Sequence, residues 1–261
     1  MKERGKSKNL WKRFLQQKYL WVLVIPGIIW ITVFCYVPLY GVTLAFKDYM
    51  PAEGIMGSPW VGLKYFKELF NDSFFWNALR NTIMYGMLNL LIGFPVPIVF
   101  AVLLNELYRM EGYKKIIQTI SYLPHFLSWA FVATFLISIT TDTGLINRML
   151  LALGIIDLPY AFMSNNVSFV IIIVISSIWK SFGYNSIMYL AAIATVDQEM
   201  YEASYIDGAK RFQRIWYITL PSIKSTIVVL LILSISSIMK SGFEQFYLLR
   251  NNLVMDVARV I

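Results

Sequence analysis

The residues whose order is most suggestive of a function form a polar segment, EASYIDGAKRFQRIWYITLP, from Glu202 to Pro221. A Glu-Ala-Ser step is followed by Asp-Gly-Ala and, after a gap, by Ile-x-Leu-Pro. Small side chains at Ala203, Ser204 and Ala209 let another surface approach this backbone closely. The pattern therefore predicts a docking element, and the chemistry it predicts is recognition of a partner.

Catalytic motifs are absent from the sequence. It contains no G-x-x-x-x-G-K-[ST] phosphate loop, no nucleophile elbow and no zinc motif. His125 is the only histidine and Cys35 the only cysteine, and a lone histidine without carboxylate or thiol companions is more often structural than catalytic or metal-bound. We expect no catalytic residues, no bound metal and no enzymatic activity in this chain.

The residues around the polar segment predict how it is built. Thr195 and Asp197 are candidate helix N-caps, and Gln198 stands where a capping box starting at Thr195 would need it. A short helix is expected through Ser204, with Gly208 as the bend after it. The segment RFQRIWYI then forms further helical turns, and Leu220-Pro221 is expected to end them.

Composition indicates that these elements belong to an integral membrane protein. The chain is 58% hydrophobic with a mean hydropathy of +0.60, and only 15% of its residues are charged, against about a quarter in soluble domains. The net charge of +8 raises the question of nucleic acid. However, the cations collect between apolar runs, as topology signals do, so no nucleic-acid partner is expected.

Long apolar runs divide the chain into a basic N-terminal region, residues 1–19, and a transmembrane region, residues 20–261. Each run is long enough to cross a hydrocarbon core about 30 Å thick at about 1.5 Å per helical residue. The predicted fold is an all-α polytopic membrane bundle with five spans. Its last residues look like the approach to a sixth span, so we expect a fragment or a truncated product. The predicted spans are 20–46, 79–104, 120–140, 167–195 and 223–239, with a loop at 196–222.

The distribution of positive charge predicts the orientation. Lysines and arginines are concentrated at residues 1–19, near Lys114 and around Lys210, whereas the alternate segments are balanced or poor in cations. Because cytoplasmic loops carry the excess of Lys and Arg, the N-terminus and the segment Glu202–Pro221 are expected in the cytoplasm.

Polar and aromatic side chains within or beside the spans are candidates for a substrate pathway. Lys180 lies near the middle of the fourth apolar run, where a charge costs at least about 2.5 kcal/mol and must face a polar route or a partner. A carbonyl or a second subunit is the alternative partner for Lys180. The candidate pathway residues are Trp179, Lys180, Tyr184, Asn185, Phe243 and Gln245.

The segment Glu202–Pro221 resembles the EAA loop of permease subunits in binding-protein-dependent ABC importers. In that family the loop is the coupling helix that sits in a cleft of the cytoplasmic ATPase. Ser204 departs from the motif, which has a second alanine there. The resemblance carries over to Glu202, Ala203, Ser204, Asp207, Gly208, Ala209, Ile218, Leu220 and Pro221.

Further segments resemble the carbohydrate-uptake branch of this family, closest to its oligo- and polysaccharide permeases. Examples are VGLKYFKELF, SYLPHFLSW and GFEQFYLL. The resemblance implies a multi-pass protein of the bacterial plasma membrane that imports sugar by alternating access. It also implies an ATPase dimer that binds ATP and Mg, a second homologous permease and an extracellular sugar-binding protein as partners.

Two other functions stay open at this point. A permease for peptides or other small solutes of the same class would carry the same loop. An ion-coupled secondary transporter would need ionisable side chains within the membrane and internal repeats, and no clear acidic residue lies within a predicted span.

Overall fold

The computed structural model describes residues 16–107, 110–240 and 242–261, and these fall into two compact units. The first unit ends at Asp72 and the second spans Ser73–Ile261. The first apolar run therefore belongs to a unit of its own, and the predicted division between a basic region, 1–19, and a transmembrane region, 20–261, stays a prediction. Most of the basic region predicted at residues 1–19 lies outside the described residues.

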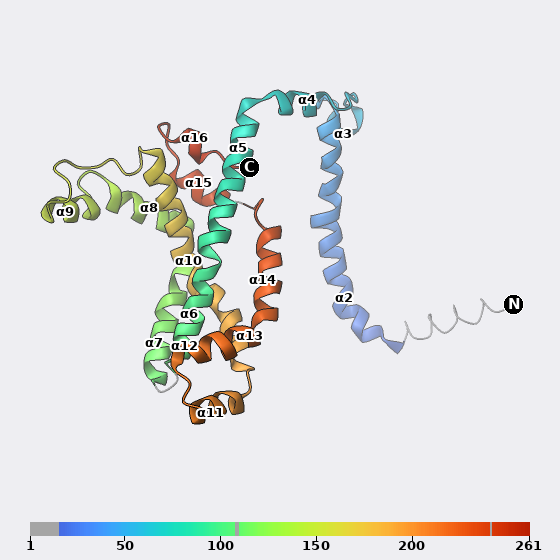
Figure 1. The fold of residues 1–261 in the computed structure, drawn as a ribbon. Helices are drawn as coiled ribbons and strands as arrows, with labels where there is room; N and C mark the ends of the chain where they lie inside the picture. The colour runs from blue at the N-terminus through green and yellow to red at the C-terminus, as the bar shows by residue number, and fades with distance from the viewer. Residues whose placement is uncertain (1–15, 108–109, 241) are drawn as a thin grey trace. The chain divides into compact units, whose positions relative to one another are not determined.

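The first unit is dominated by one helical run over the predicted span at 20–46. Helix α2, Lys18–Ile31, passes through a π-helical turn, Thr32–Tyr36, into a 3₁₀ segment, Val37–Phe46 (Figure 1). Pro38 lacks the N–H that a regular ladder requires, and it stands where the π-helical turn passes into the 3₁₀ segment. Pro26 lies within α2. Two short helices follow, α3 at Gly54–Gly57 and the amphipathic α4 at Lys64–Asn71.

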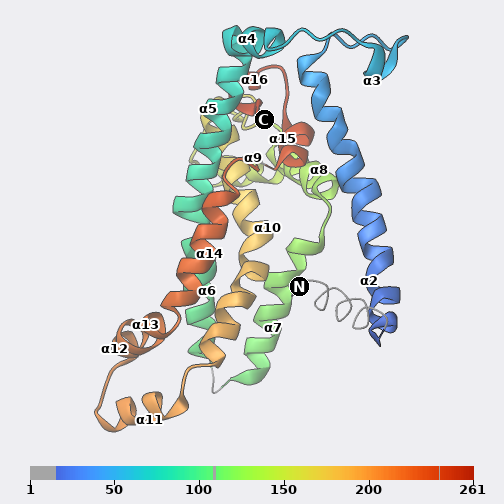
Figure 2. The same cartoon turned by 90° about the vertical axis from the view of Figure 1, so that its right-hand side faces the viewer.

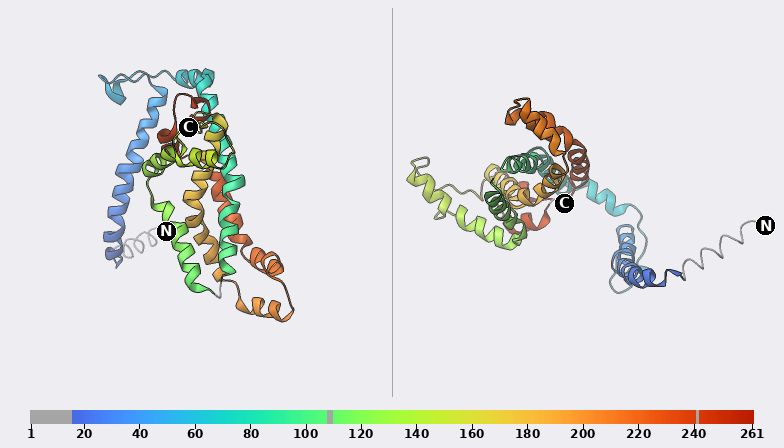
Figure 3. Two further views of the ribbon diagram at one scale, coloured as in Figure 1. Left: turned by 90° about the vertical axis from the view of Figure 1, so that its left-hand side faces the viewer. Right: turned by 90° about the horizontal axis from the view of Figure 1, so that it is seen from below.

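The second unit is a helical bundle whose long helices run roughly side by side (Figures 1 and 3). Helix α5, Ser73–Leu88, continues through a π-helical turn, Asn89–Gly93, into α6, Pro95–Asn105. The whole run of 33 residues is long and apolar enough to cross a membrane. It packs against α10, Asn166–Ala194, which is also long enough to cross.

The apolar run predicted as a single span at 120–140 is broken in the structure. Helix α7, Glu111–Tyr122, ends in a 3₁₀ turn at Leu123–Phe126, and α8 begins at Trp129 and ends at Thr140. Leu127 and Ser128 are extended, and the Ser128 hydroxyl accepts a hydrogen bond from the Phe131 N–H as the N-cap of α8. With α9, Leu145–Ala152, α8 forms a candidate span at Trp129–Ala152 instead.

The fifth predicted span, 223–239, is also shorter and bent. Helix α14, Lys224–Ser236, has 13 residues, too few to cross alone. It reaches spanning length only together with the helical segment Arg211–Ser222, from which it is bent by 64°. The described residues thus contain four candidate spans, or five if this bent pair is one.

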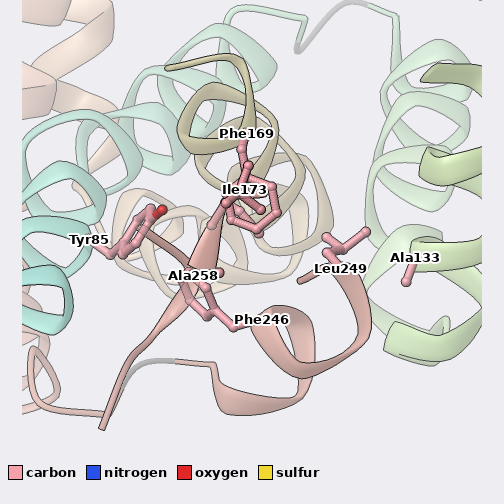
Figure 4. Packing of buried hydrophobic residues seen from close by; sticks show 8 residues of the cluster. Tyr85, Ala133, Phe169, Ile173, Phe246, Leu249 and Ala258 are labelled. Carbon is pink, nitrogen blue, oxygen red and sulfur yellow. The ribbon is translucent and has the colours of Figure 1, made fainter. Parts of the chain in front are cut away.

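Residues after α14 fold back against the end of the bundle, as α15, Phe243–Leu249, and α16, Met255–Ala258 (Figure 2). Their side chains join Tyr85 of α5 and Phe169 and Ile173 of α10 in a buried cluster (Figure 4). Polar contacts reinforce it: the amide nitrogen of Asn81 donates to the carbonyls of Asp256, at 2.7 Å, and Arg259, at 2.9 Å. This end of the unit is therefore closed by specific contacts.

Helices α7 and α10 approach each other most closely at a glycine. A Cβ atom added at Gly183 of α10 would collide with the backbone carbonyl of Ser121 in α7. Since the colliding group is backbone, it has no side-chain rotamer by which to move away. Gly112, in α7, has open space where its Cβ would be.

We predict that Gly183→Ala destabilises the second unit, whereas Gly112→Ala does not. Overpacking at Gly183 should cost about 1–3 kcal/mol, and alanine at Gly112 should be neutral or stabilising by up to about 1 kcal/mol. The measurement is the thermal unfolding of each variant purified in the same detergent. Equal melting temperatures for the two variants would show that the helices do not meet at Gly183.

Candidate functional site

The segment predicted to dock a partner forms a helix, a bend and a second helical stretch at one end of the second unit (Figure 2). Helix α11, Gln198–Ile206, begins after Asp197, whose carboxylate accepts a hydrogen bond from the Glu199 N–H at 2.9 Å. The prediction of Asp197 as N-cap is confirmed. The prediction for Thr195 is wrong, because its hydroxyl donates to the Ala192 carbonyl at 2.8 Å and ends α10.

The bend after α11 depends on Gly208. Its φ is +72°, in the left-handed region that side chains with a Cβ disfavour by about 1–2 kcal/mol. The N–H of Gly208 donates to the Tyr205 carbonyl and that of Ala209 to the Ser204 carbonyl, at 3.1 and 2.9 Å. Free carbonyls at the end of α11 are thereby satisfied, and the glycine itself is exposed with nothing within 4 Å of a built Cβ.

The second stretch runs from α12, Arg211–Arg214, through a π-helical turn, Ile215–Thr219, to α13, Leu220–Ser222. The expectation that Leu220-Pro221 ends the helix is wrong. Pro221 lies in the first turn of α13, where its missing N–H is not needed. The chain instead breaks at Ile223, which is buried among residues of α6 and α10.

One side of this loop packs on the bundle and the other is free. Ile218 and Leu220 are partly buried against a cluster that includes Ala101, Val102 and Tyr189, and Ser204 is buried too. The other residues of the pattern, Glu202, Ala203, Asp207, Gly208 and Pro221, are exposed, and Ala209 is half-buried. Large apolar side chains stand among them, with Ile206 87% and Phe212 85% exposed.

A cavity of about 630 Å³ lies within the bundle, among α5, α6, α8, α10, α14 and α15. One part of its wall is the buried cluster around Tyr85, Ile173 and Phe246 (Figure 4). Aromatic side chains line it beside polar ones, a combination that suits ligands with both apolar faces and hydrogen-bonding groups. The polar lining residues are Asn89, Ser177, Ser181, Asn185, Ser234, Ser237, Lys240 and Gln245.

Serine hydroxyls in this wall are arranged as acceptors. Ser181 donates its hydrogen to the Ser177 carbonyl, Ser234 to the Leu230 carbonyl and Ser237 to the Ser234 carbonyl, at 2.7 to 2.8 Å. Each hydroxyl has one hydrogen and two lone pairs. With the hydrogen engaged, the lone pairs are what these serines offer to a ligand.

The predicted pathway residues do not all come together. Tyr184, Asn185 and Gln245 line the cavity, whereas Trp179, Lys180 and Phe243 are not among its lining residues. Gln245 is buried, and its amide nitrogen donates to the Ile173 carbonyl and the Ser176 hydroxyl, both at 2.9 Å. It therefore ties α15 to α10 at the cavity wall.

Lys180 forms hydrogen bonds with the backbone at the break between α7 and α8. Its ammonium donates to the carbonyls of His125 and Leu127, at 2.7 and 2.6 Å, with the Pro124 carbonyl at 3.4 Å. The His125 ring stacks on Tyr184 at 3.9 Å between centroids. A carbonyl contact was one of the alternatives left open by the sequence, and here the 3₁₀ turn provides two carbonyls and the extended Leu127 a third.

Sequence reasoning missed most of the cavity wall. Ser177 and Ser181 precede the predicted Asn185 at intervals of four residues in α10, so the three lie on one face of the helix. A polar stripe of this kind within an apolar run is the signal that could have identified the two serines. Trp129 and Asn89 line the cavity as well, and no spacing in the sequence connects them to that stripe.

Comparison with known proteins identifies the family. Residues 69–248 match the model of the binding-protein-dependent transport system inner membrane component. The match covers both the cavity-forming helices and the loop at one end. The chain belongs to this family.

The chain matches relatives and a solved structure over nearly all of its residues. It is 47% identical over 257 residues to protein LplB of Bacillus subtilis, covering 98% of this chain and 80% of LplB. It is 45% identical to the polygalacturonan/rhamnogalacturonan transport system permease protein YteP of the same organism, covering 99% and 80%. A crystal structure of a bacterial ABC transporter involved in import of the acidic polysaccharide alginate matches with a TM-score of 0.88 and 38% identity, covering 97% and 84%.

The resemblance to ABC importer permeases and the all-helical polytopic fold are thus confirmed. The protein is a multi-pass membrane permease, and ATP is bound by a separate subunit of such a transporter, so this chain is not an enzyme. A periplasmic binding protein accompanies the transporter in the related alginate complex. Within the described residues, no three His, Cys, Asp or Glu side chains are grouped to hold a metal ion.

We predict that Lys180→Met lowers stability without a selective effect on substrate affinity. Hydrogen bonds from a charged donor contribute about 1.5–3 kcal/mol each, and their loss frees the break between α7 and α8. Thermal unfolding and the KM for uptake are measured together. Lys115→Met, which removes an exposed lysine from α7, is the control and should change neither. A raised KM at unchanged stability would instead place Lys180 in the substrate pathway.

Proposed function

We propose that this permease imports oligosaccharides that carry carboxylates, and that residues 196–222 dock a cytoplasmic ATPase dimer. The docking part of this proposal rests on the structure of the loop. Its Glu-Ala-Ser and Asp-Gly-Ala steps surround a glycine bend, and exposed Ile206 and Phe212 stand on the side that faces away from the bundle. A short helix flanked by exposed apolar side chains of this kind is suited to a groove of a partner.

Orientation is part of the proposal. The docking loop carries Lys210, Arg211 and Arg214, with Lys114 and Lys115 in α7 at the same end of the unit (Figure 2). Positive charge of this kind marks the cytoplasmic side. The loop and the N-terminus are accordingly assigned to the cytoplasm, and α15 and α16 to the outer side.

A second, homologous permease is proposed to complete the pathway. Helix α14 contributes Leu230, Leu233 and Ser234 to the cavity wall, yet none of its residues is buried. Val229 and Ile232, for example, are 56% and 61% exposed. In a two-permease complex these surfaces would face the partner, and alternating access would occur between the two chains.

Carboxylate-bearing sugars are proposed as substrates on two grounds. YteP is named for polygalacturonan and rhamnogalacturonan transport, and the related crystal structure is of an importer for an acidic polysaccharide. In this chain, Lys240 lies in the cavity wall, and no described carboxylate forms an ion pair with its ammonium. A lysine in this position attracts a uronate by charge.

We predict that Gly208→Val abolishes coupling in the assembled complex. Valine disfavours a positive φ, which distorts the bend, so sugar uptake and sugar-stimulated ATP hydrolysis should both fall at least about tenfold. Gly208→Asn distinguishes loss of the bend from loss of the open space at residue 208, because asparagine tolerates this backbone conformation. If Asn is tolerated, only the bend matters; if it also fails, the partner needs the open space at Gly208. Wild-type rates in both variants would remove the loop from the docking role.

We predict that Lys240→Gln weakens uptake of galacturonate oligosaccharides and spares neutral ones. One lost charge interaction corresponds to a rise in KM of about five- to tenfold. Lys240→Arg retains the charge and should retain most of the affinity for the acidic sugar. Uptake is measured with labelled di- and trisaccharides in proteoliposomes. An equal effect on acidic and neutral sugars would contradict the assignment of Lys240 to the carboxylate.

A further inference from the structure

The docking loop contains one buried charge, Arg214. Arg214 is 6% exposed, whereas the nearby Phe212 and Trp216 are 85% and 68% exposed. Arginine is almost never fully buried unless it is paired, because removing its charge from water is unfavourable. The contacts of Arg214 must therefore account for its position.

Those contacts reach both sides of the glycine bend. One guanidinium nitrogen donates to the Ala209 carbonyl at 3.0 Å, and the guanidinium carbon lies 4.0 Å from the centre of the Tyr205 ring. Tyr205 belongs to α11 and Ala209 follows Gly208. Arg214 thus fixes the shape of the bend from within the loop.

A third contact leaves the loop. The other guanidinium nitrogen lies 3.9 Å from a carboxylate oxygen of Glu106, and the two side chains are 7% and 16% exposed. Among the described residues, that oxygen has no hydrogen-bond partner. Glu106 is at the C-terminal end of α6, where the helix dipole disfavours an anion. The charge of Arg214 is what offsets both costs.

The partner helix is part of the cavity wall. Phe94 and Pro97, in the same helical run that ends next to Glu106, line the cavity. The Arg214–Glu106 contact therefore connects the bend directly to a helix that lines the cavity. A second, apolar connection exists through Ile215 and Ile218, which pack near Ala101 and Val102.

We propose that Arg214 is a positioning residue that transmits displacement of the docking loop to α6 through Glu106. This rests on the proposed function of the loop as the ATPase contact. Coupling between distant sites requires a physical connection whose arrangement both sites bias. Because the apolar connection remains when Arg214 is replaced, the loss of coupling is partial.

The test compares Arg214 with an arginine outside the docking loop. Arg214→Met and Arg148→Met each remove one positive charge from a helix, but Arg148 is exposed and belongs to α9. The quantity measured is sugar imported per ATP hydrolysed by the full complex in proteoliposomes, normalised to assembled complex. Arg214→Met should lower this ratio about tenfold, within the range typical of allosteric coupling. Arg148→Met should leave it unchanged.

A double-mutant cycle tests the connection to α6. Glu106→Gln should lower the ratio to a similar extent, and the double variant should be no worse than either single one, because all three lose the same interaction. Additive losses would overturn the proposed pair. So would an equal ratio in the Arg214→Met and Arg148→Met complexes, or a loss of assembled complex alone. Failure of the proposed function is recognised separately, by a wild-type complex whose ATP hydrolysis does not respond to sugar.

Discussion

Backbone carbonyls that leave a helix inside a membrane must find donors within the protein, because hydrocarbon offers none. In this permease the donors are long polar side chains that stand on regular helices and reach into irregular segments. Lys180 of α10 donates hydrogen bonds to carbonyls in the break between α7 and α8. Asn81 of α5 donates to carbonyls in and beside α16. Arg214 of α12 donates to the Ala209 carbonyl at the glycine bend. Gln245 makes the opposite kind of contact, since it stands on the short helix α15 and donates to Ile173 within α10.

This constraint explains where the bundle bends. A π-helical turn precedes Pro95, a 3₁₀ turn contains Pro124, and the bend before α14 follows Pro221. Pro95 and Pro124 have no N–H to donate to a helical ladder, whereas Pro221 lies in the first turn of α13. The π-helical turn before Pro95 and the 64° bend after Pro221 adjoin α6 and α14, which line the cavity. The irregular turns therefore lie on helices of the cavity wall.

The sequence allowed some of these features to be predicted and not others. Apolar runs with few charges located the regions of the long helices, and Gly208 and Asp197 located the bend and the start of α11. The break at residues 123–128 was missed because hydropathy is insensitive to backbone geometry, although Pro124 and Ser128 mark it. Lys180 was a candidate for the pathway with a carbonyl contact as the alternative, and its partners could not be named because the carbonyls it contacts are more than fifty residues away in sequence.

The serines of the cavity wall have a consequence for how a polymer passes. Hydroxyls that have already given their hydrogen to the helix behind them accept from any sugar hydroxyl, whatever its position on the ring. Ser181 offers such an acceptor on α10, and Ser177 and Asn185 place a hydroxyl and an amide at intervals of about 6 Å on either side of it. A saccharide that advances along this wall therefore meets a polar group at each interval.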